Sequence, residues 1–325
     1  MDTESLRHLA RLGYLHLEVN GQFRWRGLAR SIQRCAELFR ELVDSGVFLE
    51  EQPNNLGQGG VVSSGDEGGV GVREIRSHIV VPKAFSSPHP LSRFHPYFYR
   101  AADAVPDCLL EASQALIAEI EPLNEELFLW LAKYGDCDSS WLDAIRTGER
   151  MLRYHYYPPL PDGRVCARSI NFRDGRVEFN TLESTGTAES VGWATPHLDI
   201  GHWTWQLYSS DERLAYSIGG RKVLPMATGR IVGNVCTYLS TDIPSLHAPL
   251  HWVDIPDKPQ GDRISISMFV HTNPAAKLAN DELAGVRLYR DLAAMGYASI
   301  GDVEAVAKVL AGERWREVLE LTNIS

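Results

Sequence analysis

Two side chains that commonly bind metal ions stand two positions apart near the middle of this sequence. His197 and Asp199 lie in the segment Thr195–Gly201, within a part of the chain rich in strand-forming residues. Residues two apart in a β-strand point to the same face, so this imidazole and this carboxylate could reach one metal ion. A third ligand must come from elsewhere in the chain. His251 is the favoured candidate, and His247, four residues earlier, is the alternative.

These residue types indicate a particular metal chemistry. Two histidines and one carboxylate form a facial triad, which leaves positions open on the metal and is typical of non-haem Fe(II) oxygenases. Twelve residues after His251 comes Arg263-Ile264-Ser265, whose two polar side chains would share a strand face. A guanidinium can bind a carboxylate through two hydrogen bonds. We therefore expect Arg263 and Ser265 to bind the distal carboxylate of 2-oxoglutarate, a cosubstrate used together with Fe(II) and O2.

Four segments follow one another in a recognisable order: Met151–Pro159, His197–Thr204, Ala248–Val253 and Arg263–Ser265. Together they resemble the isopenicillin N synthase-like Fe(II)- and 2-oxoglutarate-dependent oxygenases. The resemblance implies that His197, Asp199 and His251 bind Fe(II), and that Tyr157 lies near 2-oxoglutarate with Arg263 and Ser265. The sequence departs from that family at His155, where asparagine is usual, and in the long segment between Pro159 and His197.

The resemblance also implies a fold. We expect a mainly β protein with helical flanks, built around a double-stranded β-helix, the jelly roll of cupin-like proteins. The division that follows is a mostly helical N-terminal part over residues 1–150, a catalytic core over 151–272, and C-terminal helices over 273–325 that pack on the core as one structural unit.

The residue patterns place the elements of such a fold. Apolar residues recur at helical spacing from Leu28 to Leu42, and again over 106–134 with a break expected at Pro122. Asp174-Gly175 between two strand-like runs predicts a β-hairpin. Further strand-like runs stand at 12–17, 151–157, 203–208, 231–239, 248–253 and 264–270.

The sequence specifies the substrate only loosely. We expect a small biosynthetic metabolite, belonging to specialised metabolism, that is hydroxylated, desaturated or closed into a ring. Candidate contacts to it are His155, Arg168, Asn171, Trp193 and Phe269. Trp203, Trp205 and His271 are further candidates, although aromatic residues in β cores commonly only pack. The long segment 160–194, together with the Gly-rich loop 52–71, is expected to form a lid over the site.

Composition limits the classes of partner. The 325 residues carry a formal net charge of −10, and no basic patch suggests binding to nucleic acid. The five cysteines form no CxxC pair, and no apolar run is long enough to span a membrane. We expect a cytoplasmic enzyme with a small-molecule substrate and no membrane partner; its oligomeric state is open. Two alternatives are an iron oxidase of the same fold that uses no 2-oxoglutarate, and a non-enzymatic ligand-binding barrel.

Overall fold

The structure is a computed structural model, and it describes most of the chain outside several loops. The described residues are 3–19, 25–46, 61–62, 73–74, 76–83, 91–92, 94, 105–159, 168–173, 176–181, 191–194, 196–227, 229–253, 261–294 and 298–321. No helix within this part is both long enough and apolar enough to cross a membrane. The helices are α1 (Thr3–Leu12), α2 (Arg26–Asp44), α4 (Asp107–Tyr134), α5 (Ser139–Arg146), α6 (Thr237–Asp242), α7 (Ala284–Ala294), α8 (Ile300–Ala311) and α9 (Trp315–Leu321).

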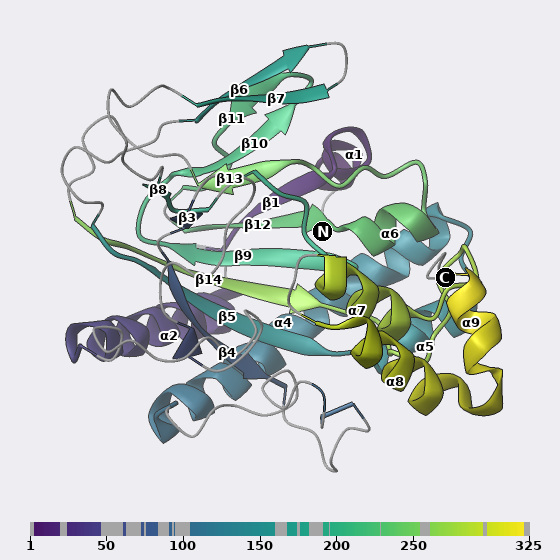
Figure 1. The fold of residues 1–325 in the computed structure, drawn as a ribbon. Coiled ribbons are helices and arrows are strands. Elements are labelled where there is room, and N and C mark those ends of the chain that lie inside the picture. Colours follow the sequence, from purple (N-terminus) through teal and green to yellow (C-terminus); the bar gives the residue numbers. More distant parts are fainter. Residues whose placement is uncertain are drawn as a thin grey trace.

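Among the residues that the structure describes, a seven-stranded antiparallel sheet runs through the centre of the molecule (Figure 1). Its strand order is β1-β12-β9-β14-β5-β4-β2, so strands from both ends of the sequence lie side by side. These strands are β1 (Tyr14–Glu18), β2 (Val61–Val62), β4 (Ser77–Pro82), β5 (Arg150–Tyr157), β9 (Trp203–Ser209), β12 (Arg230–Val235) and β14 (Arg263–Val270). The smaller pairings involve β3 (Arg73–Glu74), β6 (Arg168–Arg173), β7 (Arg176–Thr181), β8 (Val191–Gly192), β10 (Leu214–Ile218), β11 (Arg221–Val223) and β13 (His251–Val253).

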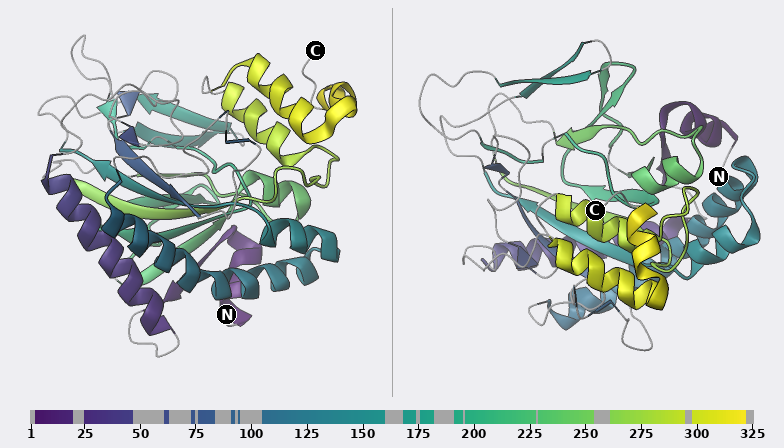
Figure 2. Two further views of the ribbon diagram at one scale, coloured as in Figure 1. Left: turned by 90° about the horizontal axis from the view of Figure 1, so that it is seen from below. Right: turned by 45° about the vertical axis from the view of Figure 1, so that its right-hand side comes forward.

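One face of the large sheet is apolar and is covered by helices. Alternate residues of β5, such as Leu152 and Tyr154, point to this face, and so do Ile264 and Ile266 of β14. Helices α2 and α4 lie next to each other across it (Figure 2). Burial of these side chains makes the main hydrophobic core, because each large apolar side chain contributes about 1.5–3 kcal/mol when it leaves water.

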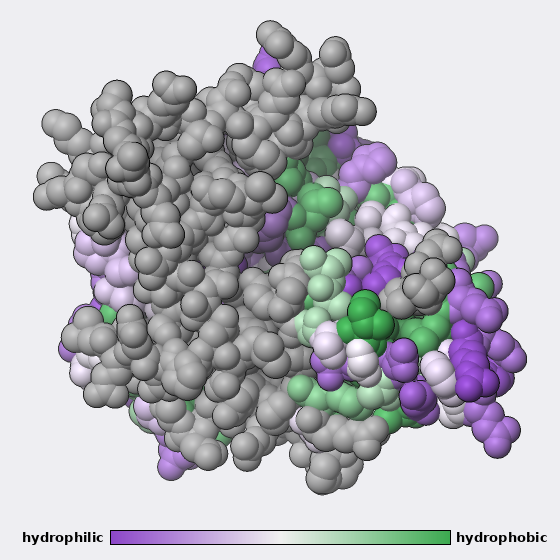
Figure 3. All heavy atoms as spheres, in the orientation of Figure 1, coloured by the Kyte–Doolittle hydropathy of each residue, from purple (hydrophilic) through white to green (hydrophobic). Residues whose placement is uncertain are grey.

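The C-terminal helices α7, α8 and α9 form a second cluster beside the sheet. Val286 and Leu292 of α7 pack with Met151 of β5 and Val80 of β4. These helices therefore cover part of the opposite sheet face, at one end of the strands (Figure 2). Their outer surface mixes hydrophilic and hydrophobic residues at the right of Figure 3.

Three of the described strands form an antiparallel sheet in the order β11-β10-β13, which packs on the other end of the same face. Leu214 and Tyr216 of β10 join Tyr14 of β1 and Val232 of β12 in one buried cluster. The small sheet is thus held against the β1-β12 edge of the large one. The two sheets bring β12 and β13 close together, and these two strands carry residues of the candidate site.

Several expected elements are confirmed, and others differ. The hairpin is present: β6 pairs with β7 up to Arg173 and Arg176, while the turn residues 174–175 lie outside the described residues, as does the loop 52–71 except for β2. The break expected at Pro122 is wrong, since α4 continues through it. Proline costs about 3 kcal/mol inside a helix, but α4 buries apolar residues on both sides of it, Leu116, Ile120, Leu123 and Leu127.

Two other expectations need correction. The strand predicted over 231–239 ends at Val235, and the chain turns into helix α6 at Thr237. Trp203 and Trp205 are not substrate contacts. Both indoles are fully buried in the main hydrophobic core, on the face of β9 that α2 and α4 cover. A Cβ on Gly233 of β12 would come within 2.3 Å of the Trp203 ring, so glycine is required beside these two indoles.

Candidate metal centre

His197 and His251 are brought together by their own backbones. The His197 N–H donates to the His251 carbonyl at 3.0 Å, and the His251 N–H donates to the His197 carbonyl at 3.1 Å. In such an antiparallel pair the two side chains stand on the same side. Their ring centroids are 4.4 Å apart. His197 therefore presents its imidazole beside that of His251, which is the first residue of β13.

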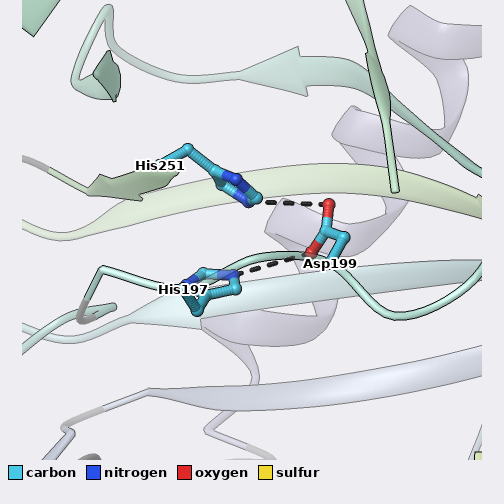
Figure 4. A group of neighbouring side chains, drawn as sticks. All are labelled: His197, Asp199 and His251. Carbon is cyan, nitrogen blue, oxygen red and sulfur yellow. Dashed lines mark ion pairs between the residues drawn. The ribbon is translucent and has the colours of Figure 1, made fainter. Parts of the chain in front are cut away.

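Asp199 completes the group (Figure 4). The Nε2 atom of His197 lies 3.6 Å from Asp199 Oδ1, and Nε2 of His251 lies 3.5 Å from Asp199 Oδ2. One ligand atom from each residue lies within 4.8 Å of the others. Two imidazole nitrogens and one carboxylate, gathered on one side, fit the donor set of a non-haem iron site with open coordination positions.

The approach of Asp199 differs from what strand alternation predicted. Only His197 makes a β-bridge, and the chain then bends through Ile200 and Gly201. The backbone N–H groups of Thr237 and Tyr238, at the start of α6, donate to the carbonyls of Asp199 and Gly201 at 3.0 and 2.8 Å. The ligand segment is therefore held by the β12-α6 junction rather than by a regular strand.

The surroundings of the group favour a deprotonated Asp199 carboxylate, and they favour the tautomer of His251 that can bind a metal ion through Nε2. Burial alone would raise the pKa of Asp199, but the neighbouring His251 and His197 outweigh it and hold that pKa well below its ordinary value. Nδ1 of His251 lies 3.1 Å from the Pro249 carbonyl, which can only accept, so Nδ1 carries the proton. In the neutral imidazole, Nε2, which faces Asp199, is then the atom with the free electron pair that a metal ion would take up.

The alternative distal ligand, His247, lies elsewhere. Its residue is exposed, and it is not part of the metal-binding group found among the described residues. Its backbone carbonyl instead abuts Gly13, where a Cβ would come within 1.9 Å. The geometry therefore favours His251.

Arg263 occupies a buried position with its guanidinium held in place. Its Nε donates to Asp211 at 2.8 Å, one terminal nitrogen donates to Ser265 Oγ at 3.2 Å, and the other donates to Ser209 Oγ at 2.9 Å. The guanidinium also lies over the ring of Tyr157, 4.6 Å from its centroid. Of the three residues expected to bind 2-oxoglutarate, Tyr157 and Ser265 thus both contact Arg263.

The anchor and the metal group are linked by a small hydrophobic cluster. Tyr157 packs with Trp193, Ala194 and Val253. Val253 stands two residues after His251 on β13, and its N–H donates to the Ala194 carbonyl at 3.2 Å. Trp193 donates from its indole to the Pro158 carbonyl at 3.1 Å. Both halves of the candidate site therefore meet where β13 passes β5.

The candidate substrate contacts have different positions. His155 faces the same sheet side as Tyr157, with ring centroids 5.8 Å apart. Burial, aided by the charges of Arg76 and Arg153, lowers the pKa of His155 well below its ordinary value, so this imidazole is neutral. Phe269 lies under the Arg153 guanidinium at 5.0 Å. For Arg168 and Asn171 only the strand pairing is described, and their side chains lie outside the described residues.

Four buried or partly buried residues of the site gave no signal in the sequence. Ser209 and Asp211 hold Arg263, while Asn234 donates to Asp199 Oδ2 at 3.3 Å and accepts from Tyr216 at 2.9 Å. None of them belongs to a short motif, and all are brought in by pairing between strands distant in sequence. Burial and the charge of Asp199 raise the pKa of Tyr216 well above its ordinary value, so its hydroxyl remains a donor.

Comparisons with known proteins give matches in structure only. No protein-family model matches the sequence, and a search of curated proteins found no match. A candidate oxygenase from Shewanella oneidensis is 18% identical, with a TM-score of 0.60 over 90% of this chain and 94% of that one. A protein from Neurospora crassa, solved in complex with alpha-KG and thymine, is 16% identical, with a TM-score of 0.56 over 85% and 81% of the two chains. JOX2, solved with 2OG, Fe and JA, is 14% identical, with a TM-score of 0.58 over 85% and 73%.

At these identities the likeness establishes the fold. The ligands of the Neurospora crassa protein and of JOX2 belong to those proteins, whereas the group His197, Asp199 and His251 is a feature of this chain. The chain has the fold seen in Fe(II)- and 2-oxoglutarate-dependent oxygenases and carries a His-Asp-His triad within it, which confirms the family resemblance predicted from the sequence.

Proposed function

We propose that this chain is an Fe(II)- and 2-oxoglutarate-dependent dioxygenase that oxidises a small metabolite of specialised biosynthesis. The observation that carries the proposal is the convergence of two histidines and one aspartate, with ligand atoms within 4.8 Å of one another. His197, Asp199 and His251 would hold Fe(II). Bound iron would supply the activation of O2, coupled to conversion of 2-oxoglutarate into succinate and CO2, that oxidises the substrate.

The chain's own residues would prepare the cosubstrate and the cavity. Arg263 and Ser265 would bind the distal carboxylate of 2-oxoglutarate, with Tyr157 beside them. Asp211 balances the buried charge of Arg263 and fixes the plane of its guanidinium. His155, neutral and buried next to Tyr157, would contribute a polar wall without adding charge.

The finer description of the fold is part of this proposal. We infer that the two sheets that pack through Tyr14, Tyr216 and Val232 are the halves of a double-stranded β-helix formed by residues 151–272. Residues 1–150 would add strands β1, β2 and β4 and two covering helices, and residues 273–325 would cover one end.

Anaerobic titration with Fe(II), followed by 2-oxoglutarate, tests the proposal. We expect one iron per chain, and an absorption band that grows only when both are present. Replacing His251 with Ala should weaken iron binding by at least about a hundredfold, because even residues that merely support ligands are worth about 10–100-fold. The matched control is His247→Ala, an exposed histidine four residues away, which should bind iron as the wild type does.

Three results would count against this proposal. Iron binding that survives in His251→Ala but is lost in His247→Ala would show that the triad is wrongly assigned. Oxidation of a substrate with no 2-oxo acid present, measured as product without succinate, would favour the oxidase alternative. A protein that binds neither iron nor 2-oxoglutarate would favour the non-enzymatic barrel.

A further inference from the structure

Besides the two histidines, Asp199 has a third side-chain partner, and this one is buried. Asn234 lies on β12, where it pairs with Thr204 of β9 and Tyr14 of β1, and its side chain is 2% exposed. Its amide nitrogen donates to Asp199 Oδ2 at 3.3 Å. Three residues further on, the Thr237 N–H binds the Asp199 carbonyl at 3.0 Å. A short stretch of chain therefore holds both the backbone and the side chain of this carboxylate.

Tyr216 fixes the direction in which that amide points. Its hydroxyl donates to Asn234 Oδ1 at 2.9 Å, so the carbonyl end of the amide faces Tyr216 and the NH2 end faces Asp199. The ring of Tyr216 also stands edge-on to His251, with centroids 5.4 Å apart. Tyr216 is 1% exposed and belongs to the small sheet, whereas Asn234 belongs to the large one.

We propose that Asn234 and Tyr216 are positioning residues for the metal. Tyr216 would orient Asn234, and Asn234 would hold one oxygen of Asp199. The carboxylate would then keep the orientation in which it faces both imidazoles. This inference rests on the proposed iron site and extends it from three residues to five. Hydrogen bonds that orient a ligand in this way change metal affinity by about 10–100-fold.

A purely structural role is the competing explanation, because the same hydrogen bonds tie the two sheets together. A structural role and a positioning role affect different measurable quantities. A structural bond supports the metal-free fold and leaves metal affinity unchanged once the protein is folded. A positioning bond changes the metal dissociation constant in protein that is fully folded.

Two residues elsewhere in the chain provide matched controls. Asn124 on α4 is 1% exposed and accepts from the Trp205 indole at 2.8 Å, on the helix-covered face of the sheet. Tyr154 on β5 is fully buried, and its hydroxyl shares a hydrogen bond with Ser113. Both copy the chemistry of the proposed pair at positions remote from the metal group.

The experiment measures Co(II) and anaerobic Fe(II) dissociation constants in full-length, metal-stripped protein. Co(II) is useful because its visible spectrum reports the geometry of its ligands. Asn234→Ala should raise both constants by about 10–100-fold and alter the Co(II) spectrum. Tyr216→Phe, which keeps the ring, should raise them about two- to tenfold, the range expected for one neutral hydrogen bond. Asn124→Ala and Tyr154→Phe should lower the thermal midpoint without changing metal affinity.

The double variant adds a test that a structural role would not pass. If Tyr216 acts through Asn234, then Tyr216→Phe should have no further effect on metal affinity in the Asn234→Ala background. Tyr216→Phe removes a single oxygen atom, so it still decides the matter if Asn234→Ala does not fold.

Unchanged metal constants in folded Asn234→Ala and Tyr216→Phe would overturn the inference while leaving the iron site intact. Failure of the proposed function is seen separately, because wild-type protein would then bind Co(II) no better than His251→Ala, and the inference would fall with it.

Discussion

Arg263 is a buried cation that already has an anionic neighbour, and this affects how it can bind another anion. Its 1% exposed guanidinium has five N–H groups, of which Asp211, Ser209 and Ser265 each engage one. Two N–H groups remain for a ligand carboxylate. Asp211 neutralises the buried charge before a ligand arrives, so the site need not be occupied for the fold to form.

Replacing Arg263 with Ala should weaken 2-oxoglutarate binding strongly. Hydrogen bonds to charged groups contribute about 1.5–3 kcal/mol, so the dissociation constant should rise about tenfold or more. The measurement is anaerobic titration of the iron-loaded protein. Arg213→Ala is the matched control, because Arg213 binds the other oxygen of Asp211 at 2.8 Å but is 35% exposed. Equal losses in both variants would place the anchor elsewhere.

The residue scale was also where the sequence was most informative. Strand alternation correctly put Arg263 and Ser265 on one face, because two neighbouring residues on a strand need no knowledge of the rest of the fold. The same rule put His197 and Asp199 together although the chain bends there. Asn234 and Tyr216 could not be found in this way, because only pairing between strands brings them to Asp199.

At the scale of elements, the segment after the two ligands depends on one backbone conformation. Gly201 has φ +119°, a backbone conformation that is strained for any residue with a side chain. A Cβ at this position would also come within 2.9 Å of the His271 ring. The Gly201 carbonyl accepts from Tyr238 at the start of α6. Glycine therefore lets the chain leave Asp199 and enter β9 without displacing either neighbour.

Gly201→Ala should both destabilise the protein and weaken metal binding. The strained backbone alone should lower the free energy of unfolding by about 1–3 kcal/mol. Displacement of Asp199 should add a loss of about tenfold or more in metal affinity. The control is Gly219→Ala, where φ is +55° and nothing lies within 4 Å of the added Cβ.

Denaturant unfolding of the metal-free variants and Co(II) titration provide the two measurements. Gly219→Ala should be less stable than the wild type but should bind Co(II) with unchanged affinity. If Gly201→Ala binds Co(II) as tightly as Gly219→Ala does, the turn does not control the position of Asp199.

Element predictions succeeded where a strand or helix is set by its own pattern. The strands at 151–157, 203–208 and 264–270 appear within one residue at each end, because each alternates between the helix-covered face and the interior. Helix α6 was missed because the apolar run 231–239 contains a strand and a helix in succession. Pro122 misled because tertiary packing outweighs its cost in α4.

Over the whole molecule, the two faces of the large sheet differ: the face under α2 and α4 is apolar, whereas the second face carries polar residues between apolar ones such as Met151 and Val232. The helix-covered face holds the main core, whereas the other face presents His155, Ser265, Ser267 and Gln206, all buried. A buried polar face is costly unless its groups find partners. Some are internal, such as Ser267 donating to Gln206 at 2.9 Å. The polar face is where a charged cosubstrate would be accommodated.

This polar interior also contains buried histidines that are neutral. Acid should destabilise the protein, because these histidines take up protons more readily in the unfolded chain. Burial, with the charges of His202 and Arg153, lowers the pKa of His271 from 6.5 to about 3. An unfolded chain takes up this proton near pH 6.5, whereas the native state does not until near pH 3. Between these values the unfolded state binds more protons, so the free energy of unfolding falls as the pH falls. For one histidine the slope reaches about 1.4 kcal/mol per pH unit.

Equilibrium unfolding of metal-free protein between about pH 6.5 and 5, above the range where most carboxylates titrate, measures this slope. His271→Gln should reduce the slope by up to about 1.4 kcal/mol per pH unit, since one proton fewer separates the two states. His247→Gln, which removes an exposed histidine, should leave the slope nearly as it is in the wild type. A slope that is unaffected by His271→Gln would mean that this imidazole takes up its proton in the native state, and that the interior is more hydrated than its burial indicates.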